Sequence, residues 1–497
     1  MASVLLTHSY HLPYDPKQVR KMQPYTPIGT LYAATALRDH GITVAVFDTM
    51  LLEPEVAFAD ALRRHRPKIV VVYEDDFNFL SKMCLTRMRD VAWSIAAAAR
   101  ETGAIVIVHG SDSTDDPDLF LGRGFDYVLC GEAEQVLVTL CSSILGGTEA
   151  PPLDGVMTNS KQGHRGQGRE RLARNSAWAQ LARPARELID LEPYRAAWQE
   201  AHGYFSTNMV SSRGCPFQCN WCAKPISGNR FHLRAAASVA EEMRSLKDVG
   251  VEHIWFGDDI FALNRHWVQV FAAQVVKQDA RLPFKVQSRA DLMHEDTVEH
   301  LKASGCAEVW MGVESGAQTI LDAMDKNLRL ETVVIARERL RAAGIRACFF
   351  LQLGYPGEGW EELQKTVAFV RKTRPDDVGI SFSYPLPGTV FYNRVQAQLG
   401  AKRNWADSDD LCIMFQATYT TEFYRAVRDA IHAEVDSWKA RSEGSHVVAD
   451  VDALWRAVET SEAASRCEQP FVFTDSANAA GVVHILPLDQ LAGSREA

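Results

Sequence analysis

Short, unbroken apolar runs alternate with longer amphipathic segments along residues 1–148. Such short runs favour strands that are buried on both faces, and the longer segments have the spacing of helices that cover a sheet. The expected strands lie at 3–8, 42–47, 68–73, 104–109 and 126–130. Helical patterns such as 29–41 and 84–103 lie between them. The alternation predicts an open, doubly wound, Rossmann-like parallel sheet, on which ligands bind beyond the carboxyl ends of the strands.

The same alternation resumes, with a longer period, over residues 205–395. The expected strands lie at 206–212, 251–257, 284–288, 307–313, 346–354 and 378–384. Amphipathic patterns such as 235–250 and 330–344 separate them. Six successive βα units predict a partial (β/α)6 barrel of the TIM type, whose functional groups gather at the carboxyl ends of the strands.

The segments outside these two domains have weaker patterns. Residues 149–204 include the polar, basic stretch "NSKQGHRGQGRERLARNS", which predicts an exposed linker. Beyond residue 395, the pattern at 421–440 predicts a helix, and 471–488 could form a terminal hairpin. We therefore expect 396–497 to be a small α+β region that caps the barrel or contacts the substrate.

Composition narrows the class of protein. A chain of 497 residues exceeds what one hydrophobic core usually serves, so two or three domains are expected. The net charge of −10 argues against a nucleic-acid partner. No stretch approaches the about 20 apolar residues of a membrane span, and the N-terminus lacks the features of a signal peptide. The ten cysteines form no secreted disulfide framework, so we expect a cytoplasmic protein with reduced thiols.

Three cysteines crowd into one loop after the first strand of the second domain. Cys215, Cys219 and Cys222 have the spacing C-x3-C-x2-C, and soft thiolates select zinc or iron–sulfur clusters. A structural zinc site needs four protein ligands, and the nearest fourth is His232, ten positions after Cys222. Three thiolates can instead hold three irons of a 4Fe–4S cluster and leave the fourth open to a small molecule. The alternative is a zinc-stabilised binding module without enzymatic activity.

The motif, with Trp221 before its last cysteine, resembles the signature of radical S-adenosylmethionine (SAM) enzymes. The resemblance implies that the open iron binds the amino and carboxylate groups of SAM. It implies that an electron from the cluster cleaves SAM to a 5′-deoxyadenosyl radical, which removes hydrogen from an unreactive position. It also implies an electron donor such as flavodoxin or ferredoxin.

Segments after the later strands are similar to the SAM-binding segments of that family. The resemblance implies SAM contacts at Gly257, Asp258, Asp259, Ser288, Arg289, Glu314 and Ser315. Four of these residues have a plainer interpretation. Asp258 and Asp259 could cap a helix, Arg289 could form a surface salt bridge, and Glu314 could pair internally with Arg289.

The first domain is similar to the cobalamin-binding domain of one branch of the superfamily, through "YTPIGTLYAATALRDHGITVAVFD", "HGSDST" and "FDYVLCGEAEQVL". The resemblance implies bound cobalamin, with candidate contacts at Gly110, Ser111, Asp112 and Gly131. The chain contains no H-x-x-G, the motif whose histidine ligates cobalt in some members. Either cobalamin binds without a histidine ligand, or the domain is a scaffold without cofactor. The acidic loop 73–79, "YEDDFNF", also departs from the branch.

The combined layout resembles the class B radical SAM methyltransferases. The resemblance implies cobalamin-dependent methylation of an unactivated carbon in a small-molecule substrate such as a natural product or lipid. A radical SAM cyclase or rearrangement enzyme, with a non-methylating or cofactor-free first domain, is an alternative. A tRNA methylthiotransferase would need three further cysteines for a second cluster, and the spacing of Cys84, Cys130 and Cys141 does not resemble that arrangement.

Overall fold

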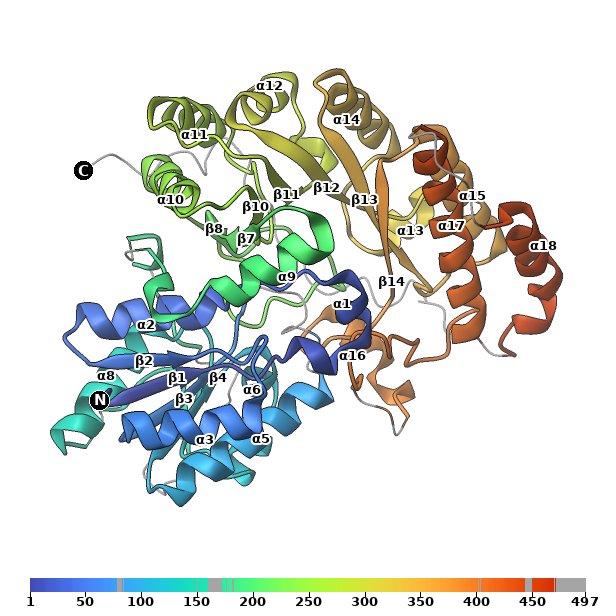
Figure 1. The fold of residues 1–497 in the computed structure, drawn as a ribbon. Coiled ribbons are helices and arrows are strands. Elements are labelled where there is room, and N and C mark those ends of the chain that lie inside the picture. Colours follow the sequence, from blue (N-terminus) through green and yellow to red (C-terminus); the bar gives the residue numbers. More distant parts are fainter. Residues whose placement is uncertain are drawn as a thin grey trace.

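The first domain is a doubly wound parallel sheet, as the sequence predicts (Figure 1). The computed structural model describes residues 1–77, 83, 85–149, 151–159, 172–175, 177–180, 183–400, 402, 404–442, 449–468 and 470. The strand order is β2-β1-β3-β4-β5-β6. The strands span Val4–Thr7 (β1), Val44–Phe47 (β2), Ile69–Tyr73 (β3), Ile105–His109 (β4), Tyr127–Leu129 (β5) and Val156–Thr158 (β6). Only β6 runs antiparallel among these strands, and it lies where the sequence predicts a linker.

Helices cover both faces of this sheet. Helices α2 (Ile28–Asp39) and α8 (Glu134–Gly146) pack on one face, while α3 (Pro54–His65) and α5 (Thr86–Glu101) pack on the other (Figure 1). Consecutive residues of each central strand therefore enter two separate apolar clusters. This two-sided burial is the physical reason that the strands appear as continuous apolar runs in the sequence.

The second domain is an open half-barrel of parallel strands in the order β14-β13-β12-β11-β10-β7. In chain order the strands span Ser206–Met209 (β7), His253–Phe256 (β10), Phe284–Ser288 (β11), Cys306–Glu314 (β12), Arg346–Leu353 (β13) and Asp377–Phe382 (β14). On its outer side lie α10 (Ala236–Asp248), α11 (Arg265–Lys277), α12 (Glu295–Ser304), α14 (Leu330–Ala342) and α15 (Trp360–Thr373) (Figure 1). The predicted partial barrel is confirmed. A short hairpin, β8 (Ser212–Arg213) with β9 (His232–Leu233), follows β7.

Helix α9 (Glu192–His202) lies between the two domains (Figure 1). Its Tyr194 hydroxyl donates to Asp48 Oδ2 at 2.7 Å, and Trp198 Nε1 donates to the carbonyl of Pro24 at 2.8 Å. Both rings are buried. This part of the expected linker is therefore packed structure, whereas residues 160–171 of its polar stretch lie outside the described residues.

The C-terminal region is helical where the structure describes it. Helices α17 (Thr421–Ser442) and α18 (Val451–Ser461) stand beside the β14 end of the half-barrel (Figure 1). The expected hairpin at 471–488 lies outside the described residues. Within the part of the chain that the structure describes, no helix has the length and apolar character needed to cross a bilayer.

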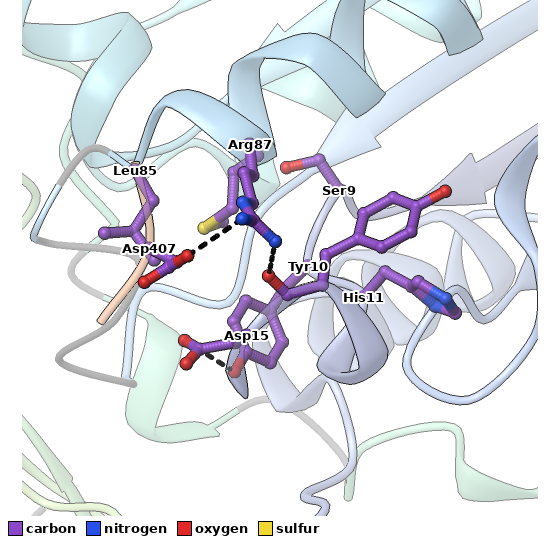
Figure 2. Close-up of a pocket in the computed structure, with 9 residues that line it drawn as sticks. Ser9, Tyr10, His11, Asp15, Leu85, Arg87 and Asp407 are labelled. Atoms are coloured by element: carbon purple, nitrogen blue, oxygen red, sulfur yellow. Dashed lines mark hydrogen bonds and ion pairs between the residues drawn. The ribbon is translucent and has the colours of Figure 1, made fainter. Parts of the chain in front are cut away.

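A segment before α17 reaches back to the first domain. The amide of Thr86, at the start of α5, donates to the carbonyl of Trp405 at 2.9 Å. Arg87 forms a 3.1 Å ion pair with Asp407. Figure 2 shows the pocket between these segments, with Arg87 directed toward Asp407. The C-terminal region thus contacts both domains.

Candidate functional site

The three cysteines of the motif lie on the loop that joins β8 to β9, at the carboxyl ends of the half-barrel strands. Cys215, Cys219 and Cys222 are all half-buried and free of disulfides. The Lys224 ammonium closes the loop on itself by donating to the carbonyl of Cys215 at 3.0 Å. Burial raises the pKa of the Cys215 thiol, while a backbone hydrogen bond and Lys224 act in the opposite direction.

Asn220 fixes the middle of this loop. Its amide nitrogen Nδ2 donates to the Ala323 carbonyl and to Asp325 Oδ2, both at 2.8 Å. Its Oδ1 accepts from the Tyr355 hydroxyl at 2.7 Å. The side chain between two cysteines is thereby tied to the segments that follow β12 and β13. Sequence analysis did not single out Asn220, because its partners lie more than a hundred residues away.

The donors present fit an iron–sulfur cluster with an open iron. Three thiols that form no disulfide share one loop, and iron–sulfur clusters are normally held by cysteine thiolates. A structural zinc site needs four protein ligands, and each lies about 2.0–2.3 Å from the metal. No three His, Cys, Asp or Glu side chains among the described residues surround one such point. His232, the candidate fourth ligand, lies 3.5 Å from Glu132 instead.

Asp258 holds the base of the cysteine loop rather than a helix end. Its Oδ1 accepts from the hydroxyls of Ser211 at 2.6 Å and Ser212 at 2.5 Å. Burial raises the pKa of Asp258 to about 6, and the serine hydrogen bonds oppose that rise. The helix-cap interpretation is wrong, because α11 begins at Arg265 and its cap is Asn264.

The neighbours of Asp258 complete this strand end. The amide of Gly257 donates to the carbonyl of Met209 at 2.8 Å, which continues the pairing of β10 with β7. The side chain of Asp259 is exposed. Positions 257–259 therefore lie at the base of the cysteine loop.

Arg289 is buried at the carboxyl end of β11. It forms a bidentate ion pair with Asp291, with two contacts of 2.9 Å. It also donates to the carbonyl of Lys326 at 3.0 Å, and its guanidinium lies 3.9 Å from the centre of the Phe217 ring. The surface salt-bridge interpretation is wrong, because the residue is only 5% exposed. The preceding Ser288 donates to the carbonyl of Phe261 at 2.8 Å.

Glu314 ends β12 in a strained conformation. Its φ of +65° is unusual for a residue other than glycine, and the pairing register with β13 shifts between Gly312 and Glu314. Its carboxylate accepts from Lys326 Nζ at 2.8 Å. The alternative interpretation, in which Glu314 pairs internally with Arg289, is therefore wrong. The neighbouring Ser315 hydroxyl lies 3.1 Å from the hydroxyl of Thr366.

Lys326 pairs with this carboxylate next to the cysteine loop, with its Nζ 5.9 Å from the centre of the Trp221 ring, and neither Lys326 nor Tyr384 was singled out from the sequence. Burial by itself would lower the pKa of Lys326. The charges of Glu314 and Cys219 act in the opposite direction, and the net effect is a pKa above the usual lysine value. Burial raises the pKa of Tyr384, which follows β14, and the charges of Cys222 and Glu314 add to the rise. The site thus combines thiols, a buried ion pair and a phenol at one edge of the half-barrel.

A pocket lies at the carboxyl edge of the first sheet, and two of the candidate cobalamin contacts line it. Ser111 and Asp112 line the pocket. The Ser111 hydroxyl is buried without a hydrogen-bond partner in the described residues, which fits a polar ligand. Asp112 forms a bidentate pair with Arg89, at 2.5 and 2.6 Å. At Gly110, a Cβ atom would lie 2.8 Å from Cγ of Glu74, so glycine allows that side chain to approach.

Gly131, the fourth candidate, is explained by packing within the first domain. Its φ is +91°, and a Cβ atom would lie 2.6 Å from the carbonyl oxygen of Ala173. Its own carbonyl lies 2.8 Å from His109 Nε2. A cobalamin contact at Gly131 stays a prediction.

Two family profiles match the chain. The profile described as the radical SAM superfamily matches residues 209–370, and the profile described as a B12 binding domain matches residues 22–141. An uncharacterized methyltransferase of Pyrococcus horikoshii is 25% identical over 386 residues, which cover 76% of this chain and 80% of that relative. The hopanoid C-3 methylase of Methylococcus capsulatus is 23% identical over 380 residues, which cover 75% of this chain and 69% of that relative.

Two solved structures share the fold over both domains. The radical SAM methyltransferase TsrM from Kitasatospora setae, solved with tryptophan and a SAM analogue, has a TM-score of 0.65 at 19% identity. That match covers 80% of this chain and 77% of TsrM. The cobalamin-dependent SAM radical enzyme OxsB, solved with aqua-cobalamin and SAM, has a TM-score of 0.66 at 16% identity. That match covers 93% of this chain and 71% of OxsB.

Proposed function

We propose that this chain, which belongs to the radical SAM superfamily and carries an N-terminal B12-binding domain, is a methyltransferase that acts on an unactivated carbon. Its cofactors are a 4Fe–4S cluster, SAM and cobalamin. When bound, they supply reductive SAM cleavage and methyl transfer. The observation that carries the proposal is that the three cysteines share one loop at the carboxyl edge of the half-barrel, where Lys326 of the buried Glu314–Lys326 pair lies 5.9 Å from the centre of the Trp221 ring in that loop.

The residues of this chain hold and orient the reactants. Cys215, Cys219 and Cys222 would hold three irons and leave one coordination position to SAM. We propose that the SAM contacts come from the strand ends at Gly257, Asp258, Asp259, Ser288, Arg289, Glu314 and Ser315. Lys326 fixes the Glu314 carboxylate at 2.8 Å, and Asp258 fixes the base of the cysteine loop through Ser211 and Ser212.

The first domain would supply the cobalamin site through Gly110, Ser111, Asp112 and Gly131. The unpaired hydroxyl of Ser111 in the pocket supports this assignment. The sheet edge that bears these residues adjoins the β8–β9 hairpin, because Arg213 of β8 contacts Glu134 at 2.5 Å. This contact supports an arrangement in which methyl transfer and radical formation occur between the two domains.

We propose a small natural product or lipid as the substrate. The hopanoid C-3 methylase, named for a lipid substrate, is similar to this chain over three quarters of its length. TsrM, which shares the fold, was solved with tryptophan as substrate. The enzyme needs a reductant, and we propose that flavodoxin or ferredoxin serves as the electron donor.

The products formed from SAM test this proposal without knowledge of the substrate. The chain would be reconstituted anaerobically with iron, sulfide and hydroxocobalamin, reduced, and incubated with SAM. A methyltransferase releases S-adenosylhomocysteine when the methyl group leaves SAM, and releases 5′-deoxyadenosine when the radical forms. We expect both products with cobalamin, and loss of S-adenosylhomocysteine when cobalamin is omitted. Formation of 5′-deoxyadenosine alone would instead support a radical cyclase or rearrangement enzyme.

A further inference from the structure

Three buried carboxylates of the first domain contact the hairpin that carries the cysteine loop: Glu132, Glu134 and Asp76, whose Oδ2 lies 3.6 Å from Arg213 Nη2. Glu132 lies in the turn after β5, Glu134 is the first residue of α8, and both are 0% exposed. We call residues 132–134 the acidic turn. The hairpin strands β8 and β9 flank the loop that bears the three cysteines. A buried carboxylate is costly unless it is paired and hydrogen-bonded, so its partners indicate what the turn is built to hold.

Glu134 holds the first strand of the hairpin. Its Oε1 accepts from Arg213 Nη2 at 2.5 Å, and its Oε2 accepts from Asn175 Nδ2 at 3.1 Å. Burial alone would raise the pKa of Glu134, but the Arg213 charge and the hydrogen bonds from Arg213 and Asn175 together outweigh burial and lower the pKa to about 2. Arg213 is 3% exposed, and its guanidinium lies 5.1 Å from the centre of the Phe77 ring and 4.7 Å from that of Trp178.

Glu132 holds the second side of the hairpin. Its Oε2 forms a 3.1 Å ion pair with Arg230 Nη2 and accepts from the amide of Asn175 at 3.0 Å. Its Oε1 lies 3.5 Å from His232 Nε2, in β9. The two glutamates therefore contact the chain immediately before and after the cysteine loop.

At the base of the loop, the chain next to Arg213 packs directly against the chain at Arg230. Gly214 lies between Arg213 and Cys215 and has a φ of +82°. A Cβ atom at Gly214 would lie 2.2 Å from the carbonyl oxygen of Arg230. The two sides of the hairpin are thus in direct contact, and a shift of Arg213 or Arg230 would move the Cys215 end of the loop.

We propose that Glu132 and Glu134 are positioning residues that hold the cysteine loop against the B12-binding domain. In this arrangement the first domain determines where the cysteine loop lies relative to the edge of the first sheet that bears the proposed cobalamin contacts. The role of this contact in catalysis rests on the proposed function. The contact between the acidic turn and the loop is a property of the chain without any cofactor.

The test compares Glu134→Gln with a matched control at the opposite end of the half-barrel. Asp376→Asn also removes one carboxylate charge from a buried arginine, since Asp376 Oδ2 lies 3.4 Å from Arg337 Nη2. Hydrogen exchange of the cofactor-free full chain would be followed by mass spectrometry. We expect Glu134→Gln to exchange residues 211–234 roughly tenfold faster than wild type, while exchange at 306–314 stays unchanged. Asp376→Asn should leave 211–234 at the wild-type rate.

A second measurement connects the loop to the cluster. In reconstituted protein, we expect an iron chelator to remove iron roughly fivefold faster from Glu134→Gln than from wild type, because a loosened loop opens more often. The change that SAM causes in the electron paramagnetic resonance spectrum of the reduced cluster should be diminished in Glu134→Gln and retained in Asp376→Asn. A carboxylate that only adds general stability would not alter this spectrum selectively.

Wild-type exchange at 211–234 together with wild-type iron release in Glu134→Gln would overturn the proposal. If circular dichroism shows that Glu134→Gln does not fold, the same measurements are made on Arg230→Gln. The Arg230 side chain is 34% exposed, so its replacement perturbs the folded core less. The same outcomes apply to that variant. If wild-type protein bound no iron, the proposed function would fail, while the exchange experiment would still decide whether the acidic turn holds the loop.

Discussion

Replacement of Lys326 by methionine tests whether the buried ion pair organises the end of β12. Lys326 is 6% exposed and Glu314 is 5% exposed, and their charged atoms lie 2.8 Å apart. Methionine is similar in length to the lysine stem, so Lys326→Met removes the charge with little loss of packing. The carboxylate of Glu314 would then be buried without its cation, in a backbone conformation that is already strained.

The geometry gives the size of the effect. Two unit charges at this distance attract by about 6 kcal/mol at an effective dielectric constant of about 20. Desolvation offsets much of this attraction, and removal of one partner of a buried pair typically costs about 3–5 kcal/mol. We therefore expect Lys326→Met to lower the free energy of local opening at β12 by about 3 kcal/mol, which is roughly a 100-fold rise in the exchange rate.

Native-state hydrogen exchange of the amides at 309–313 measures this quantity directly. Local exchange is preferable to a denaturation midpoint, because a chain with several domains need not unfold in two states. The double variant Glu314→Gln with Lys326→Met is the control, since a neutral pair of similar volume is often tolerated. We expect it to recover most of the loss. Exchange within about threefold of wild type in Lys326→Met, or no recovery in the double variant, would refute the reasoning.

Three further predictions concern a thiol, a buried carboxyl and a glycine. Cys219→Ala should abolish 5′-deoxyadenosine formation with the circular dichroism spectrum unchanged, whereas Cys467→Ser should retain activity; turnover by Cys219→Ala contradicts the cluster assignment. Burial raises the pKa of Glu358 from 4.5 to about 8, so the stabilisation present below pH 4.5 is lost as pH rises through 8. The free energy of local opening around Glu358, measured by native-state hydrogen exchange, should therefore fall in wild type relative to Glu358→Gln between about pH 5 and 8 by about 4 kcal/mol, and parallel curves would disprove this. Gly312→Ala places a methyl group 2.6 Å from Glu314 Oε1 and should speed hydrogen exchange of the β12 amides. An unchanged exchange rate would contradict this prediction.

The sequence predicted the two sheets because their central strands are buried on both faces. It missed β6, which is only three residues long and pairs at the edge of the first sheet. It also predicted a linker where α9 packs between the domains. The buried residues of α9 have partners at Asp48 and Pro24, 146 and 174 residues away, and a local pattern of polarity does not reveal such contacts.

The site was predictable to the extent that it follows from strand ends and thiol spacing. The cysteines and the residues after β10, β11 and β12 could be placed together, because the carboxyl ends of parallel strands share one edge. The partner of Glu314 could not be found in this way. Lys326 reaches it through a turn in which both Asp325 and Asn327 have positive φ, a conformation that residue type alone does not dictate.

The most direct test of the cofactor assignment is anaerobic reconstitution with iron, sulfide and hydroxocobalamin, followed by gel filtration, metal analysis and a visible spectrum. We expect about four irons and four sulfides per chain, lost in a variant without Cys215, Cys219 and Cys222, together with cobalamin that stays with the protein. Protein that remains colourless and free of iron, or that carries one zinc ion and no cobalamin, would contradict the account.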